Sequence, residues 1–251
     1  MPPEKRRHFL STIDYFGSNY AKVTFYILVQ RHHREDLKNV TVNNAEVRVK
    51  LNQLLVNGQS NNREQVFKVR KNLDTNLDSP TDLTQGNQEC SEARVSNLGF
   101  TFLAAHSHPL SENCNLFGMF SGGDILQLAK MATFYQGQGA THFNTYTFIL
   151  TYDLKAYAIK FDKQEAVESL IDIYTNSEKF IDFRKQFIRD YEKLADQPGE
   201  IASESELMSG MFDILEGFNL DISLYKAATG NNFVTGWNKI NQETLQQEPC
   251  N

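Results

Sequence analysis

The chain has 251 residues, a net charge of −6 and 40% hydrophobic residues, which suffices to bury the core of one or two domains. The acidic balance offers no basic stripe of the kind that nucleic-acid-binding proteins carry, so we expect no nucleic-acid partner. No run approaches the roughly 20 apolar residues that cross a bilayer, so we expect no membrane span.

The three cysteines, Cys90, Cys114 and Cys250, are widely spaced and form no Cys-x-x-Cys pair. The sequence therefore predicts neither a cysteine zinc site nor a disulfide framework. No signal peptide is convincing near the start. We favour a cytoplasmic protein, or an exported one if the chain is already processed. The composition says nothing about the oligomeric state.

Residues 1–38 are interpreted as an N-terminal extension with one element in it. Within residues 21–30, Val23, Phe25, Ile27 and Val29 alternate with their neighbours, which favours a strand over a helix. Residues 43–57 fit either period and end at Asn57-Gly58. Residues 64–70 read as a short strand, and residues 72–92 carry so few apolar side chains that we expect an exposed loop there.

An apolar, aromatic run over residues 98–105 predicts a buried strand, with a short buried helix as the alternative. His106 and His108 follow it, and two residues of a strand that are two positions apart point to the same face. Pro109 has no N–H for the sheet ladder, so the strand should end there. Two imidazoles on one face at the exit of a strand are well placed to bind one metal ion.

Ser121-Gly-Gly-Asp124 precedes an apolar-periodic segment, so it should lie where a helix begins. Asp124 is the candidate third ligand. Two histidines and one aspartate would leave zinc an open position for water, which is the arrangement of catalytic zinc sites. Each part also has an ordinary explanation: His-x-His occurs by chance, and Ser-x-x-Asp is a common helix N-cap. The combination is what predicts a metal site.

The remaining elements predict a mixed α/β architecture. Residues 146–152 and 155–161 are two apolar runs around Asp153-Leu154 and predict a hairpin. Aromatic and apolar side chains then recur at helical spacing over residues 180–194 and 207–218, with Pro198-Gly199 between the two helices. One late strand is expected from residue 219, before a polar terminus that contains Trp237.

His106-Ser-His108-Pro followed by Ser121-x-x-Asp124 resembles the zinc-binding signature of the JAMM (JAB1/MPN+) metalloproteases. The resemblance covers roughly residues 40–162, although twelve residues separate His108 from Ser121, several more than the family usually has. It implies a JAMM/cytidine-deaminase-like core of a mixed sheet flanked by helices. The implied division is an N-terminal extension (1–38), a JAMM-like domain (39–162) and a mostly helical C-terminal extension (163–251).

The resemblance also implies roles. His106, His108 and Asp124 would hold Zn²⁺, a glutamate from an earlier strand would be the general base, and Ser121 would stabilise the oxyanion. Glu64 is the first candidate for that base because it opens a strand after a possible helix. Glu46 is the second. Glu89 and Glu92 lie in the expected loop and are weaker.

The implied activity is hydrolysis of a peptide or isopeptide bond by a zinc-activated water, with a protein or peptide as substrate. One alternative is an inactive JAMM-like module that binds zinc or another protein. A second is an amidohydrolase, but that site needs further histidines downstream, where only His142 remains. We also expect the long segment 110–120, with apolar Leu116, Phe117, Met119 and Phe120, to cover the metal.

Overall fold

The computed structural model describes residues 35–58, 62–71, 78–89, 93, 100–110, 118–136, 146–194, 202–231 and 233–248. Within these ranges, eight strands form one sheet in the order β2-β1-β4-β5-β6-β7-β8, and β3 also pairs with β1. The strands are β1 (Gln65–Lys71), β2 (Asp78–Pro80), β3 (Thr84–Gln85), β4 (Thr101–Ser107), β5 (Thr147–Tyr152), β6 (Lys155–Phe161), β7 (Ile222–Gly230) and β8 (Phe233–Lys239).

The sheet is mixed. β4 and β5 run parallel, whereas the other neighbouring strands of the sheet pair antiparallel. Helix α3 lies between β4 and β5 in the chain, as the connection of a parallel pair requires. The prediction of an α/β fold with a mixed sheet flanked by helices is therefore confirmed.

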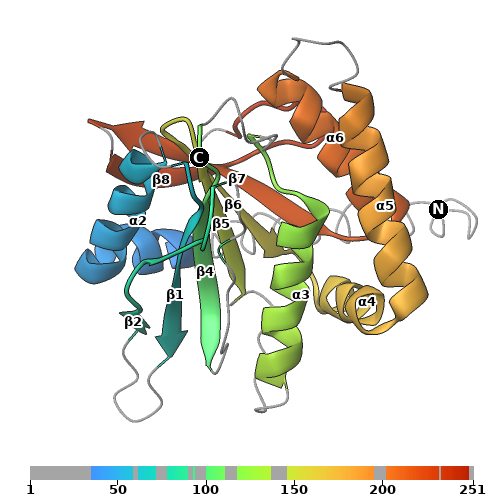
Figure 1. Ribbon diagram of the computed structural model, residues 1–251, viewed down its shortest axis with the longest axis horizontal. Coiled ribbons are helices and arrows are strands. Elements are labelled where there is room, and N and C mark those ends of the chain that lie inside the picture. Colours follow the sequence, from blue (N-terminus) through green and yellow to red (C-terminus); the bar gives the residue numbers. More distant parts are fainter. Residues whose placement is uncertain are drawn as a thin grey trace, which may run out of the picture.

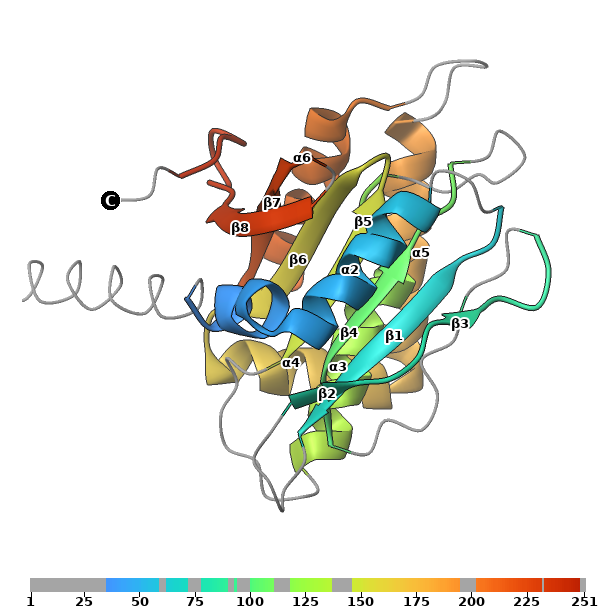
Figure 2. The same ribbon diagram turned by 90° about the vertical axis from the view of Figure 1, so that its left-hand side faces the viewer.

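Helices cover both faces of the sheet (Figure 1). The π-helix η1 (Asn39–Asn43) and α2 (Ala45–Asn57) lie on one face, and the remaining helices lie on the other (Figure 2). These are α3 (Gly122–Gln136), α4 (Gln164–Thr175), α5 (Ser177–Leu194) and α6 (Glu204–Gly217).

Alternation along the strands divides the buried side chains into two cores. On β4, Ala104 belongs to the core beneath α3–α6, whereas Leu103 and Ala105 belong to the core beneath α2. Successive residues of a strand point to opposite faces. His106 therefore faces the α3 side, and Ser107 faces the α2 side.

The β5–β6 hairpin forms as predicted, around a two-residue turn. Asp153 and Leu154 both have positive φ, 47° and 57°, which is the conformation that joins antiparallel strands with the correct twist. Leucine is an unusual residue there. The pairing of Tyr152 with Lys155 and of Leu150 with Tyr157 fixes the register of the hairpin.

The structure resolves one open local prediction and corrects another. Residues 43–57 are resolved in favour of helix α2, which begins at Ala45 with the Asn44 side chain as its N-cap. The expected loop over 72–92 contains β2 and β3, which pair with β1. Such two- and three-residue strands carry no periodicity of their own, because the pairing with β1 defines them.

The C-terminal third also differs from the prediction. Residues 164–194 form two helices, α4 and α5, that separate at Asn176, whose side chain accepts hydrogen bonds from the amides of Glu178 and Lys179. The single late strand is in fact two, and Trp237 lies buried in the second. The domain boundaries at 38 and 162 stay predictions, although β7 and β8 continue the same sheet. The strand expected over 21–30 lies outside the described residues.

Candidate metal centre

His106 and His108 lie where β4 ends, between β1 and β5. Every residue of β4 is buried, because the strand is paired on both edges and covered on both faces. His106 is paired with Leu150 on β5, and the amide of His108 donates to the carbonyl oxygen of Thr151 at 2.9 Å. Both imidazoles are 3% exposed, so they are placed by the sheet and are not free to swing into solvent.

Asp124 comes from the first turn of α3, which begins next to the end of β4. The amide of Ser121 donates to Asp124 Oδ2 at 2.7 Å, and the amide of Asp124 donates to Ser121 Oγ at 3.3 Å. This reciprocal pair is a helix-capping arrangement, and it fixes the carboxylate at the helix start. In the described part of the chain, the Ser121 hydroxyl accepts this bond without donating one of its own, so its proton is available to another acceptor.

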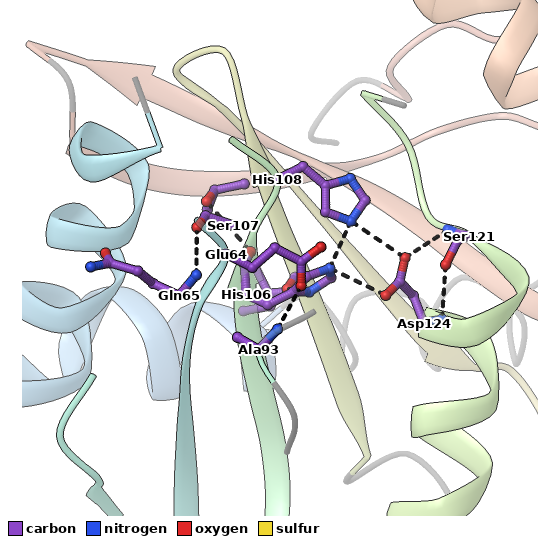
Figure 3. A network of polar contacts seen from close by, with 10 residues as sticks. Glu64, Gln65, Ala93, His106, Ser107, His108, Ser121 and Asp124 are labelled. Carbon is purple, nitrogen blue, oxygen red and sulfur yellow. Dashed lines mark hydrogen bonds and ion pairs between the residues drawn. The ribbon is translucent and has the colours of Figure 1, made fainter. Parts of the chain in front are cut away.

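The three side chains converge on one point (Figure 3). His106 Nε2 lies 3.0 Å from His108 Nε2 and 3.2 Å from Asp124 Oδ1, and His108 Nε2 lies 3.7 Å from Asp124 Oδ2. Within the described residues, this is the group of three His, Cys, Asp or Glu side chains whose ligand atoms all lie within 4.8 Å of one another.

The spacing of these atoms fits a tetrahedral metal ion. With metal–nitrogen bonds of about 2.05 Å, two tetrahedral ligands are separated by roughly 3.3 Å. The two imidazole nitrogens are 3.0 Å apart and approach different oxygens of Asp124, at 3.2 and 3.7 Å, so a small rotation of the carboxylate would bring one oxygen near that distance from both. The site can therefore hold a metal ion with its side chains close to where they already are.

The tautomer of His106 also suits a ligand. Its Nδ1 lies 3.2 Å from the carbonyl oxygen of Ile149, which can only accept a hydrogen bond, so Nδ1 carries a proton. A neutral imidazole then has its lone pair on Nε2, the atom that faces His108 and Asp124. Holding a ligand histidine by its second nitrogen is the usual way in which proteins orient it.

The electrostatics favour charge on the aspartate. Burial, the largest influence, raises the pKa of Asp124, but His106, His108 and the amide of Ser121 outweigh it and hold the pKa far below its ordinary value. Burial lowers the pKa of His106, yet Asp124, Glu64 and the Ile149 carbonyl together raise it overall. Without a metal, a proton thus compensates the carboxylate. A metal ion would replace that proton.

Glu64 lies beside the ligand group, immediately before β1. It is 4% exposed, and its carboxylate accepts a hydrogen bond from the amide of Ala93 at 2.9 Å. Val66 is paired with His106, and Glu64 is two residues from Val66, so the alternation places it on the face that carries the histidines. Figure 3 shows its carboxylate next to His106.

The other candidate glutamates do not share this position. Glu46 is exposed in the first turn of α2, close to Asn44, whose amide donates to the carbonyl of Asp78. Asp78 pairs with Lys71, at the end of β1 away from Glu64, a span of roughly 20 Å along the strand. Glu89 is exposed, and Glu92 lies outside the described residues.

The segment expected to cover the metal is described only at its ends. Leu116 and Phe117 lie outside the described ranges, and Leu110 is 46% exposed. Met119 and Phe120 are fully buried in the core beneath α3–α6. These two side chains are therefore core, which is what their apolar character required. The three cysteines also lie outside the described residues.

Two partners of the site were not visible in the sequence pattern. Ala93 and Ile149 each contribute a backbone group, and any residue but proline has the same backbone donor and acceptor. Only the pairing of β4 with β5 could have placed the Ile149 carbonyl near His106.

Comparison with known proteins returns no relative: no protein-family model matches the chain, no curated protein matches it, and no solved structure matches its fold. What the site can do therefore has to be argued from its own residues. Among the helices of the described residues, each is too short or too polar to span a membrane.

Proposed function

We propose that the protein is a zinc-dependent metallopeptidase or isopeptidase of the JAMM type, which hydrolyses a peptide or isopeptide bond with His106, His108 and Asp124 as the metal ligands. The observation that carries the proposal is the convergence of these three ligands beside a second, buried carboxylate, that of Glu64. A second carboxylate beside the ligands supplies a group that can carry a proton, which hydrolysis requires.

The donor set supports zinc as the metal. Two imidazole nitrogens and one carboxylate oxygen suit zinc, and three protein ligands leave its fourth position open. A zinc ion in this site would supply an acidified water and polarise the substrate carbonyl.

Glu64 would move the proton. As general base it would accept a proton from the attacking water and then deliver it to the leaving nitrogen, and the Ala93 amide would keep its carboxylate oriented. Both histidines serve as ligands, so a carboxylate is the natural proton carrier here.

Ser121 would act on the developing oxyanion. Its hydroxyl proton is available as a donor, and the reciprocal bonds with Asp124 fix the serine next to the metal ligands. Peptide hydrolysis needs both a proton carrier and a donor to the oxyanion, and the chain has one of each beside the ligand group.

The substrate would be a protein or a peptide rather than a nucleic acid, in keeping with the net charge of −6. A cytoplasmic location is favoured, and an exported protein remains the alternative if the chain is processed.

The test combines metal analysis with turnover on peptide and isopeptide substrates. We expect one zinc per chain, and we expect Glu64→Gln to keep the zinc while turnover falls on the order of 10²-fold or more. Glu46→Gln is the matched control, because Glu46 is exposed at the far end of α2, and it should be fully active. Zinc binding without turnover on any such substrate would instead favour an inactive zinc-binding module.

A further inference from the structure

Ser107, the residue between the two histidines, makes a hydrogen bond that joins the ligand strand to the strand that follows Glu64. The amide of Gln65 donates to Ser107 Oγ at 3.1 Å (Figure 3). Ser107 is 1% exposed and points to the face opposite to the histidines, so its hydroxyl cannot act on a substrate. It can act only through the residues that it holds.

The bond lies where the pairing of β1 with β4 ends. Val66 and His106 are the last residues paired there, and beyond them the serine side chain takes the place of a backbone acceptor. Gln65 directly follows Glu64, so the Ser107 hydroxyl restrains the backbone one peptide unit away from the glutamate. This bond ties the start of β1 to the exit of β4, while the pairing of Gln65 with Gln85 and the bond from the Gly86 amide to the Glu64 carbonyl at 2.9 Å tie the same backbone to β3.

The end of α2 closes over this bond. The Asn57 side-chain amide donates to Gln65 Oε1 at 3.0 Å, and the amide of Leu110 donates to the Gly58 carbonyl at 3.1 Å. A Cβ atom on Gly58 would be in ordinary van der Waals contact with the Ser107 Cβ, at 3.6 Å, so the helix end lies beside the serine. Ser107 is 1% exposed, so bulk water does not reach the hydroxyl.

We propose that Ser107 is a positioning residue that fixes Glu64 relative to the metal ligands. The inference rests on the proposed function of Glu64 as general base. The Ala93 amide holds the carboxylate and the Gly86 amide holds the Glu64 carbonyl, while the Ser107 hydroxyl is the contact that fixes this backbone relative to the strand of the histidines. A general base works only within hydrogen-bond reach of its proton, which is why a small displacement of this strand end matters.

The first measurement is amide hydrogen exchange in the metal-free protein, which needs no activity. Ser107→Ala removes the acceptor, and we expect the Gln65 amide to exchange at least about 10-fold faster while amides in the middle of β1, such as that of Phe67, keep their rates. Unchanged protection at Gln65 would overturn the proposal. Ser107→Cys, with a weaker acceptor, is the second variant should the alanine fail to fold.

The second measurement separates positioning from stability. Ser107→Ala should keep its zinc and its KM while kcat falls about 10- to 100-fold, the size of effect that misplacement of a reacting group produces. In a Glu64→Gln background, the same substitution should change kcat by less than about 2-fold, because the group that it positions has gone. Equal losses in both backgrounds would show that Ser107 acts on stability or on the metal, and would overturn the proposal.

Ser223→Ala is the matched control. It removes another buried serine hydroxyl, on β7, that touches none of the site residues named above. It should change neither the Gln65 exchange rate nor kcat. A wild-type protein without turnover would overturn the proposed function, and the exchange measurement would still decide whether Ser107 holds Gln65.

Discussion

The two faces of the sheet each bury a cluster of ionisable side chains, and the two clusters are built differently. On the α3 face, His106, His108 and Asp124 direct their lone pairs at one point. On the α2 face, Lys160 of β6 is 2% exposed, with Asp36 and Asp162 as the carboxylates that act on it. Asp162 also accepts the Ser223 hydroxyl at 2.6 Å on each oxygen and lies 3.6 Å from Lys239 Nζ.

The difference lies in what compensates each buried charge. Around Lys160, the carboxylates Asp36 and Asp162 offset part of the cost of burying the lysine charge, and both come from the chain itself. Around Asp124, the residues that the structure describes supply donor atoms for a cation but no lysine or arginine ion pair, and His106 and His108 compensate the carboxylate when protonated. Burial of charged side chains is therefore a poor indicator of a binding site by itself. Donor atoms that converge on one point, with no lysine or arginine beside them, are a better indicator.

The largest expected effect is loss of the proposed metal from the α3-face cluster when its ligands are removed. The double variant His106→Ala, His108→Ala should lose essentially all bound zinc, because a single carboxylate cannot hold it. A chelator should strip the wild-type protein to the same metal content and lower its melting temperature, since a bound metal stabilises the folded state by mass action. Elemental analysis and thermal melts measure both.

Lys160→Met is the control for that experiment, and it should keep its zinc because the Lys160 cluster lies on the other face. Full zinc content in the double histidine variant would exclude the proposed ligand set. Loss of zinc from both variants would mean that the two clusters are coupled through the sheet.

The sequence predicted the parts of the metal centre that local patterns specify. The buried β4, the shared face of His106 and His108, and the start of a helix at Asp124 each follow from a short stretch of chain. Glu64 was harder. Its position beside His106 depends on the register of β1 against β4, in which Val66 pairs with His106, 40 positions later in the chain. The order of elements along the chain suggested Glu64 as the base, and the pairing of β1 with β4 places it beside His106.

The Lys160 cluster could not be predicted from the sequence for the same reason. Lys160 lies in an alternating run of β6 and is an unremarkable strand residue by pattern, and its partner Asp36 comes from a helix 124 residues earlier. Likewise, the polar composition after residue 230 concealed β8, whose Trp237 is buried in the core beneath α2 and donates its indole N–H to Thr41 of η1. Contacts between distant segments decide both the Lys160 cluster and β8. The hydrophobic periodicity of one segment contains no information on such contacts.

A smaller expected effect is a dependence of folding stability on pH that comes from Lys160. Burial lowers the pKa of Lys160 to about 8, despite the opposing influence of Asp36 and Asp162. Below pH 8 the lysine is charged in both the folded and the unfolded chain, and the folded state bears the full cost of burying it. As the pH rises from 8 towards 10.5, the folded protein releases the proton first. The unfolded state then binds more protons, so stability rises.

Lys160→Met removes this titration. The difference in free energy of unfolding between wild type and variant should move by about 2–3 kcal/mol in favour of the wild type between pH 7 and pH 10. Urea unfolding at several pH values measures it, and the other titrating groups cancel in the difference. A difference that stays constant over this range would mean that Lys160 has an ordinary pKa and that its charge is better compensated than we infer.

The smallest expected effect concerns Ser223, whose hydroxyl donates to Asp162 in the Lys160 cluster. Ser223→Ala removes a hydrogen bond to a charged group, and Asp162 is partly open to water, with 21% of its side chain exposed, so water can replace some of that bond. We expect a loss of about 1–2 kcal/mol in the free energy of unfolding. That corresponds to a fall of roughly 2–8 °C in melting temperature for a chain of this size.

Ser209→Ala, at an exposed position of α6, is the control and should change the free energy of unfolding by less than about 0.5 kcal/mol. Zinc content should be the same in both variants and in the wild type. If Ser223→Ala lowered zinc content, the α2-face cluster would be part of the metal centre's support, and the separation of the two faces drawn above would be wrong.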